Sequence, residues 1–412
     1  MKISPFQALR PKNGLEKQIA SLPYDVMDSK EAAAMAAGNP KCFLHVVRSE
    51  IDLDPALDPH DEAVYVQARL NLDALVANGD LVRENAASFY IYRQTLGGHS
   101  QTAVVACCEI DDYAGGTILR HEKTRKDKED DRFNHILSTN ANTGQVFLAY
   151  RECAAINWLV ESECKAAPLY DFTADDSVRH TVWRAVKTAA IEQAFHAVPK
   201  AYIADGHHRS AASFRAGMKR RDDAAASAAG ADPAAEYNRF MACLFPASQL
   251  AVLPYNRLVK DLNGLTEEAF LAQAASRFAM TDADSPAPAG ACSCAFYIGG
   301  KWRKLSWELT DAQKADPVSA LDVARLQDDL LAPVLGIADP RTDPRIYFSG
   351  GIRGTGELEQ AVDSGAAAVA FSMFPTAVDQ VMSIADAGQI MPPKSTWFEP
   401  KLRSGLLIHT LD

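Results

Sequence analysis

One short segment constrains the fold more than any other. Residues 200–213 read KAYIADGHHRSAAS. An apolar run that is typical of a buried strand leads into Asp205-Gly206, and an alanine-rich helical pattern follows at once. Glycine permits the sharp bend and the close backbone approach that such a junction requires. The segment therefore predicts a strand, a tight turn and a helix in direct succession.

The residues of this turn suit an anionic ligand. A helix that begins here offers unpaired N–H groups and the positive end of its dipole, and Arg209 adds a planar fork that matches phosphate. His207 and His208 can donate or carry protons near neutral pH, and Asp205 can orient a histidine, bind a metal ion or accept a proton. The alternative is a capped turn with a solvated basic cluster. We favour a site, because paired histidines followed by arginine at a tight turn have little structural use.

The rest of the chain mixes hairpins with helices. In two places a glycine pair separates two apolar strand patterns, which predicts hairpins over 89–108 and 292–307. Elsewhere apolar residues recur at helical spacing, and the clearest helices span 62–78 and 319–335. This mixture predicts an α+β or mixed α/β fold. We expect a core region over 1–283 with an alanine-rich excursion near 222–235. A Pro/Ala/Gly stretch at 285–291 leads to a C-terminal α/β region over 292–412, packed on the core as one unit.

A second charged segment covers residues 119–132, LRHEKTRKDKEDDR. His121 and Glu122 follow an apolar pair, so we expect them at the end of a strand, where Glu122 could act as a general base or a metal ligand. The mixed charges at 126–131 are typical of a solvated helix with i,i+4 pairs.

A third segment, MPPKSTWFEPKLRSGL at 391–406, is basic and rich in hydroxyl groups. Lys394, Ser395 and Thr396 could clamp a phosphate, and Lys401 and Arg403 follow closely. The segment lacks the frame of a Walker A loop. The alternative is a structured tail whose aromatic pair at 397–398 docks on the core.

Composition excludes several classes of function. The chain has 412 residues, 48% of them hydrophobic, and a net charge of −11, so a disordered chain is excluded and binding to nucleic acid or an anionic membrane is disfavoured. No run of 18 apolar residues and no secretory signal core occurs, so we expect a cytoplasmic protein without a membrane span. The eight cysteines are irregularly spaced without C-x-x-C, which indicates neither a structural zinc site nor a disulfide framework.

The motifs, taken in order, resemble those of a bacterial family. SPFQALRP with LPYDV, then HEKT…DR, ADGHHR and MPPKSTWFEPKLRSGL are similar to the family called domain of unknown function 1015. The ADGHHR turn also resembles the D-G-H-x-R turn of the ParB/sulfiredoxin-like superfamily, which includes nucleotide-hydrolysing partition proteins, sulfiredoxins and free serine kinases. The resemblance implies a ParB/sulfiredoxin-like core that is elaborated with a C-terminal α/β region. One departure is Asn256, where many relatives carry a histidine before Arg257.

What the resemblance implies is a phosphotransferase that uses Mg²⁺ and ATP or ADP, with L-serine or O-phosphoserine as the first candidate substrate. It places Asp205, Gly206, His207, His208 and Arg209 at the phosphate site and makes Glu122 the counterpart of the carboxylate base. We expect Glu122 or Asp205 to take the hydroxyl proton or to bind Mg²⁺. Further phosphate ligands would be Lys394, Ser395 and Thr396, and supporting residues would be Asp25, His121, Arg132 and Arg403.

Two other functions fit the same motifs. The first is a phosphoserine phosphatase, which would release phosphate without a nucleotide. The second is a nucleotide-gated, ParB-like DNA-binding switch without catalysis, although the acidic charge disfavours it. For the phosphotransferase the expected partners are a small substrate and a nucleotide, and the chain could form a homodimer.

Overall fold

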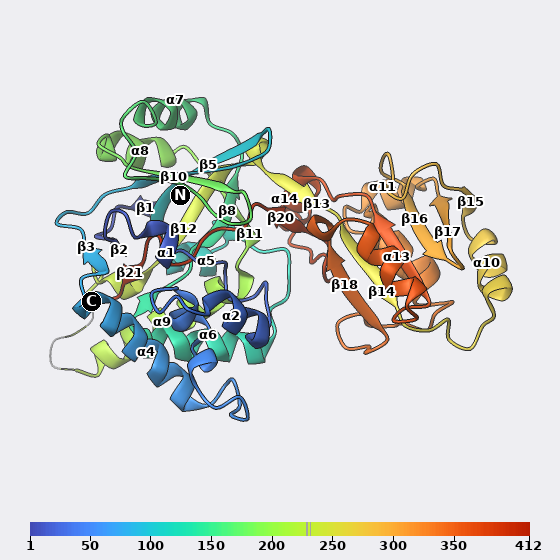
Figure 1. Cartoon of the computed structure of the whole chain (residues 1–412). Helices are drawn as coiled ribbons and strands as arrows, with labels where there is room; N and C mark the ends of the chain where they lie inside the picture. Colours follow the sequence, from blue (N-terminus) through green and yellow to red (C-terminus); the bar gives the residue numbers. More distant parts are fainter. Residues whose placement is uncertain (228–229, 231) are drawn as a thin grey trace. The chain divides into compact units, whose positions relative to one another are not determined.

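In the computed structural model, which describes residues 1–227, 230 and 232–412, the chain divides into two units (Figure 1). The first comprises Met1–Leu250 and Pro400–Asp412, and the second comprises Ala251–Glu399. Both contain helices and mixed or antiparallel sheets, so the predicted mixed α/β class is confirmed. The sequence predicts a boundary at 283–292, whereas the units divide at 250 and 400. The stretch at 285–291 instead joins two strands of one sheet inside the second unit, which explains why it does not separate units.

The first unit is built on a sheet that has nine strands within the described residues. Two of its pairs, β11 with β6 and β12 with β8, are parallel, and the other pairs are antiparallel. Across the sheet the strands are β6 (Ile118–Leu119), β11 (Ala201–Asp205), β8 (Val146–Tyr150), β12 (Arg239–Pro246), β5 (His99–Glu109), β4 (Tyr90–Leu96), β10 (Arg179–Arg184) and β9 (Tyr170–Thr173), and β1 (Ile3–Ser4) also pairs with β5.

Helices cover both faces of this sheet. Figure 1 shows α7 (Ala154–Glu163) and α8 (Thr188–Phe195) on one side, and α4 (Glu62–Ala77), α6 (Lys126–Thr139) and α9 (His207–Ala225) on the other. The central strand β5 is buried along most of its length, as expected for a strand packed on both faces. The remaining elements are α1 (Glu16–Ile19), α2 (Ser29–Ala36), α3 (Leu44–Val47), α5 (Ile110–Ala114), the 3₁₀ turns η1 (Ser49–Asp52), η2 (Glu236–Asn238) and η3 (Ala247–Gln249), and the two-stranded sheets β2 (Leu9–Pro11) with β3 (Leu81–Arg83) and β7 (Ala141–Asn142) with β21 (His409–Thr410).

The second unit contains an antiparallel sheet of six strands among the described residues. Their order is β15 (Ala279–Asp282), β17 (Lys301–Ser306), β16 (Ser293–Ile298), β19 (Val369–Met373), β14 (Tyr255–Val259) and β18 (Ile346–Gly350). One core packs apolar side chains of the sheet against α10 (Glu267–Ala275), α12 (Asp322–Leu326), the π-helical turn η4 (Gln327–Leu331) and α14 (Val378–Asp386). A smaller core packs α13 (Gly356–Asp363) on the sheet. The unit is completed by α11 (Asp311–Ala315), η5 (Gly351–Arg353) and the pair β13 (Ala251–Leu253) with β20 (Trp397–Glu399).

The predicted elements form with one main difference. The helix at 62–78 and both hairpins are present, but the helix predicted over 319–335 begins at Asp322 and passes into the π-helical turn η4. Its start is delayed because the Asp316 carboxylate accepts hydrogen bonds from the backbone and hydroxyl of Ser319, which folds this stretch into a turn. Of the alanine-rich excursion predicted near 222–235, the start belongs to α9, and residues 228, 229 and 231 lie outside the described residues. No described helix is long and apolar enough to cross a membrane.

Candidate functional site

The junction between β11 and α9 has the predicted form. Asp205 ends the strand, Gly206 adopts a left-handed conformation with φ of 98°, and the helix begins at His207. A Cβ on Gly206 would lie 3.2 Å from the guanidinium of Arg209. Glycine is required here both by the backbone angle and by this close approach. We call Asp205–Arg209 the DGHHR turn; the first N–H groups of α9 follow it without acceptors inside the helix.

Arg209 is buried within this turn. Its Nη2 lies 3.5 Å from Oδ1 of Asp205 and 3.9 Å from Oδ2 of Asp25, and its Nη1 donates to the carbonyl of Gln145. Burial acts to lower the pKa of Arg209, but the two carboxylates outweigh it and raise the pKa, so the cation persists. Its Nε and the side-chain nitrogen of Gln145 find no hydrogen-bond partner among the described residues. Buried donors without an acceptor are rare in folded proteins, and here they are consistent with a ligand that supplies one.

Asp205 is held by two cations. The Nζ of Lys401 lies 3.1 Å from its Oδ2, and Arg209 approaches its other oxygen. Burial acts to raise the pKa of Asp205, but Lys401 and Arg209 lower it well below its usual range. Asp205 is therefore an ionised residue whose charge is already compensated.

His207 joins the turn to the HEKT segment. The backbone N–H of His121 donates to Nε2 of His207 at 3.5 Å, and Nδ1 of His207 lies 3.6 Å from Oε2 of Glu122. Because a backbone N–H can only donate, Nε2 is the acceptor and the proton of the neutral ring is on Nδ1, facing Glu122. Burial lowers the pKa of His207 to about 3, so the ring is neutral at physiological pH. Nδ1 of the ring thus faces the Glu122 carboxylate, whose side chain is 32% exposed.

His208 is tied to the same segment from the other side. Its Nε2 accepts the backbone N–H of Arg125 at 3.0 Å, and burial lowers its pKa. The His121 ring packs edge-on against His207 with centroids 4.5 Å apart, and neither of its nitrogens has a partner among the described residues. Burial and the neighbouring His207 lower the pKa of His121 to about 3. The imidazole rings of His121, His207 and His208 are therefore neutral and lie together beside the charged turn; we call these three rings the neutral wall.

A second guanidinium lies in a small cavity next to Arg209. Arg132 donates to Asp131 at 2.7 Å and stacks over the ring of Tyr24 at 4.0 Å. The cavity volume is about 30 Å³, which is room for about one water molecule. Its lining includes residues of the LPYDV, HEKT…DR, ADGHHR and KLRSG segments and comprises Pro23, Tyr24, Val47, Arg132, His135, Ile136, Asn142, Thr143, Gly144, Arg209, Ser213 and Ser404.

Several residues singled out from the sequence lie elsewhere or serve other contacts. Arg403 pairs with Asp176 and donates to Nε2 of His180, so its guanidinium is engaged with β10. In the second unit, the Ser395 hydroxyl donates to the Pro392 carbonyl, and the ammonium of Lys394 lies 5.3 Å from the ring centre of Tyr255. The predicted phosphate clamp of Lys394, Ser395 and Thr396 thus belongs to a different unit from the DGHHR turn, and it remains a prediction.

Asn256 also belongs to the second unit. Its side-chain oxygen accepts the backbone N–H of Met373 at 3.1 Å, and the residue is buried in the sheet. This contact gives the Asn256 amide a structural role in the sheet.

Sequence reasoning did not assign Lys401, Tyr24 or Gln145 to the site. Lys401 and Tyr24 belong to motifs that were singled out, KLRSG and LPYDV, but nothing inside those motifs indicates which residues they contact. Gln145 carries no comparable signal, because its contribution is a backbone carbonyl and an amide brought in by the start of β8.

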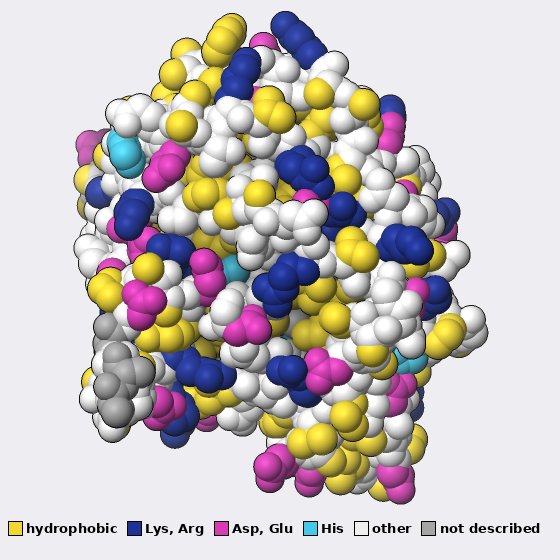
Figure 2. All heavy atoms as spheres, turned by 90° about the vertical axis from the view of Figure 1, so that its left-hand side faces the viewer, with side chains coloured by type: hydrophobic (Ala, Val, Ile, Leu, Met, Phe, Trp, Pro, Cys, Tyr) yellow, Lys and Arg dark blue, Asp and Glu magenta, His cyan; other side chains and the backbone are white. Residues whose placement is uncertain are grey.

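The face of the molecule drawn in Figure 2 carries mixed charge. Figure 2 shows Lys and Arg side chains interspersed with Asp and Glu over the displayed face of the molecule, without a continuous basic stripe. Extended contact with a nucleic-acid backbone needs such a stripe.

Comparisons with known proteins agree with the motif pattern. The model of a family described as "Protein of unknown function (DUF1015)" matches residues 3–324. No curated protein matches the chain. Among solved structures, a free serine kinase in complex with AMP is 13% identical, covering 73% of this chain and 92% of that chain with a TM-score of 0.36.

Two further solved structures show a similar degree of likeness. SbnI with a C-terminal truncation from Staphylococcus aureus is 10% identical, covering 74% of this chain and 87% of its own with a TM-score of 0.41. A conserved hypothetical protein from Pyrococcus furiosus is 13% identical, covering 73% and 95% with a TM-score of 0.34.

Proposed function

The chain belongs to the DUF1015 family of proteins of unknown function, and we propose that it is a nucleotide-dependent phosphotransferase that acts on a small hydroxylated metabolite. One observation carries the proposal. Arg209 keeps a permanent positive charge in a buried position, and its Nε has no acceptor among the described residues. The same guanidinium lies at the N-terminus of α9, where backbone N–H groups and the helix dipole also favour an anion. Together they form a cradle that suits a phosphate group.

Phosphoryl transfer needs a positioned hydroxyl, an acceptor for its proton and compensation of charge on the phosphate. In the proposed step the substrate oxygen forms a bond to the terminal phosphorus of the nucleotide, while the bond from that phosphorus to the bridging oxygen of the leaving nucleotide breaks. Glu122 takes the hydroxyl proton. His207 holds the Glu122 carboxylate in place through Nδ1, and Arg209 compensates the charge of the phosphate.

The two carboxylates predicted to bind Mg²⁺ differ in their surroundings. Asp205 is already paired with Lys401 and Arg209, so it is a poor ligand, whereas Glu122 is partly exposed and faces a neutral ring. Mg²⁺ prefers a few carboxylates together with nucleotide phosphates and water. Because Glu122 takes the substrate proton in the proposed step, we expect Mg²⁺ to be held mainly by the nucleotide phosphates and water. When bound, the ion would neutralise charge on the phosphates.

The substrate class follows from the charges around the cradle. Asp25 is a partly exposed carboxylate that can pair with an ammonium group, and the neighbouring guanidinium groups can pair with a carboxylate. A zwitterion with a hydroxyl group satisfies both. L-serine is the first candidate, with O-phosphoserine as the substrate of the reverse reaction.

The test is a two-way assay on the full chain. The protein is incubated with ATP or ADP, Mg²⁺ and a panel of hydroxy-amino acids, and in reverse with O-phosphoserine and the nucleotide diphosphate or monophosphate. We expect nucleotide-dependent formation of a phosphorylated amino acid. Glu122→Gln should lower kcat by about 100-fold or more, because the amide cannot accept the proton.

The matched control is Asp73→Asn, which removes an exposed carboxylate that pairs with Arg69 on α4 and should leave the rate unchanged. No turnover in either direction across the panel would reject the proposal. Release of inorganic phosphate from O-phosphoserine without any nucleotide would instead establish the phosphatase. Salt-dependent retention of duplex DNA without turnover would favour the non-catalytic switch.

A further inference from the structure

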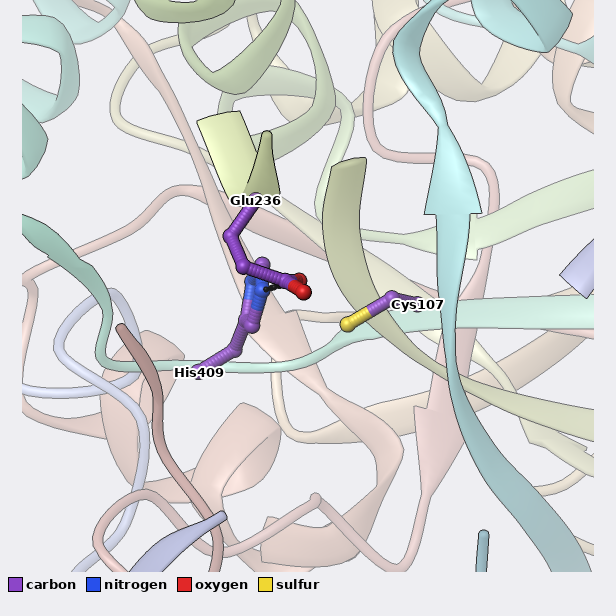
Figure 3. Close-up of side chains that lie close together, drawn as sticks. All are labelled: Cys107, Glu236 and His409. Carbon is purple, nitrogen blue, oxygen red and sulfur yellow. Dashed lines mark hydrogen bonds and ion pairs between the residues drawn. The ribbon is translucent and has the colours of Figure 1, made fainter. Parts of the chain in front are cut away.

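Three potential metal ligands lie close together in the first unit. They are far apart in the sequence, so no short motif reveals them. Cys107 lies on β5, Glu236 on η2 and His409 on β21, and Figure 3 shows their side chains directed at one another. One ligand atom from each lies within 4.8 Å of the other two. Nε2 of His409 is 2.8 Å from Oε2 of Glu236. Cys107 and His409 are buried, whereas the Glu236 side chain is 32% exposed.

Neighbouring hydrogen bonds fix which nitrogen of His409 carries a proton. The backbone N–H of Met241 donates to Oδ1 of Asn142 at 3.2 Å, which identifies that atom as the amide oxygen. The same oxygen is 3.1 Å from Nδ1 of His409. Since an oxygen of this kind only accepts, Nδ1 must carry the proton. A neutral His409 therefore directs the lone pair of Nε2 at the carboxylate of Glu236.

Two lone pairs at hydrogen-bond distance repel, so a positive centre must lie between them. A proton, on either the imidazole or the carboxyl group, is one solution, and a metal ion is the other. A proton satisfies the imidazole and the carboxylate but gives the thiol of Cys107 no part in the arrangement. A metal ion uses all three atoms, and the Nδ1 contact with Asn142 is the outer hydrogen bond that metal-bound histidines usually make.

We propose that Cys107, Glu236 and His409 bind a zinc-class divalent ion, with Sγ, a carboxylate oxygen and Nε2 as its ligands. Thiolate, imidazole and carboxylate are the set that zinc prefers. The thiolate and the carboxylate together balance the two positive charges of the ion, which makes the complex neutral in a largely buried place. Because Glu236 is partly exposed, we expect a water molecule as the fourth ligand. On binding, the thiol proton and any second proton on the imidazole pass to solvent.

The site would fasten the C-terminal segment to the sheet. β21 is only two residues long and pairs with β7 over two residues. The chain just before it supplies Lys401, which holds Asp205 of the DGHHR turn. A metal bridge from His409 to β5 would therefore stabilise the end of the chain that completes the candidate site, as structural zinc sites do by adding binding energy to folding.

The experiment uses Co²⁺ as the probe on the full chain after treatment with a chelator. A thiolate bound to Co²⁺ gives a strong charge-transfer absorption in the near ultraviolet, which oxygen and nitrogen ligands alone do not give. We expect this band to saturate at one equivalent in the wild-type chain. It should be lost in Cys107→Ser and strongly reduced in His409→Gln. Zn²⁺ should displace Co²⁺ and raise the Tm of the wild-type chain but not that of Cys107→Ser.

The matched control is Cys108→Ala. Cys108 is the next residue of β5 and packs in the hydrophobic core on the opposite face, so this variant should keep the band. Absence of the band in the wild-type chain, or an equal band in Cys107→Ser, would overturn the proposal. If Cys107→Ser fails to fold, Glu236→Gln gives the same decision, because its side chain is partly exposed and its loss should weaken Co²⁺ binding at least about tenfold. Metal binding is measured without nucleotide, so this result is independent of the phosphotransferase assay.

Discussion

Gly206 determines where the guanidinium of Arg209 can lie. Its φ of 98° is in the region that side chains with a Cβ rarely adopt, and the space that a Cβ would fill is taken by the guanidinium at 3.2 Å. The backbone angle and the buried cation therefore depend on each other. A substitution here changes both the stability of the turn and the position of the phosphate-binding group.

We expect Gly206→Ala to lower the free energy of unfolding of the first unit by about 1–2 kcal/mol from backbone strain, with an added penalty for displacing Arg209. Nucleotide affinity should fall at least about tenfold, because a charge-assisted contact to phosphate is lost. Urea denaturation and nucleotide titration of the same preparation measure the two effects.

The comparison variant is Gly97→Ala in the hairpin between β4 and β5. Gly97 also has a positive φ, of 57°, but no atom lies within 4 Å of its added Cβ. This variant should lose stability through strain alone and keep its nucleotide affinity. Equal losses of affinity in the two variants would show that Arg209 is not positioned by Gly206.

At the scale of elements, patterns of adjacent residues predicted the secondary structure well, whereas contacts between segments far apart in the sequence were not predicted. The strand, the glycine turn and the helix at 200–213 follow from adjacent residues, and so does the placement of Glu122 just after a short strand. The contacts of Asp25 and Lys401 with this turn join segments about 200 residues apart in sequence, and no local pattern encodes them. The metal cluster is hidden for the same reason.

The start of α12 contains a carboxyl group that opposes folding at neutral pH. Burial raises the pKa of Asp322 to about 6, and its Oδ1 accepts the backbone N–H of Cys292 at 2.9 Å. A carboxyl whose pKa is raised in the folded state stabilises below its unfolded pKa and loses that contribution as the pH rises through about 6. At pH 7 the buried carboxylate is therefore a cost to the second unit.

Asp322→Asn should raise the free energy of unfolding of the second unit by about 1–2 kcal/mol at neutral pH, since the amide keeps the acceptor without the charge. The gain should disappear at a pH below the ordinary pKa of an aspartate side chain, where both the carboxyl group and the amide are neutral. Hydrogen exchange of the backbone amides of β16 and β17, measured at several pH values, reports this gain in the free energy of unfolding. The control, Asp316→Asn, removes a carboxylate that accepts from Ser319 and should give no gain. A gain that does not depend on pH would contradict the explanation.

At the scale of the whole chain, the second unit is an insertion into the first. The chain leaves the first unit after Leu250 and returns at Pro400, and the two ends of the inserted unit pair as β13 and β20, with Ala251 opposite Glu399. The insertion begins and ends in strands and not in a Pro/Ala/Gly stretch, which explains why composition placed the boundary elsewhere. The returning segment then contributes Lys401 to the candidate site.

The first unit should lose stability steeply in mild acid. Burial lowers the pKa of His121, His180 and His207 to about 3 and that of His135 to about 4. Neighbouring cations add to the effect, with Arg403 acting on His180 and Arg132 on His135. In the unfolded chain these side chains titrate near 6.5, so between that pH and about 4 the unfolded state binds up to four more protons than the folded state. The stabilisation is complete above the unfolded pKa and decreases as the pH falls.

Each such proton changes the free energy of unfolding by about 1.4 kcal/mol per pH unit, so we expect a loss of up to about 5 kcal/mol per unit near pH 5. The pKa values of Asp131 and Asp205 are also lowered, so their contributions to the free energy of unfolding are lost only in more acidic solution. Urea denaturation of the full chain at several pH values measures the slope. His180→Gln should reduce that slope by about 1.4 kcal/mol per pH unit, which is the contribution of one proton, because glutamine does not titrate. A free energy of unfolding that stays level between pH 7 and pH 5 would mean that these imidazoles are reached by solvent, and the neutral wall beside the DGHHR turn would then have to be abandoned.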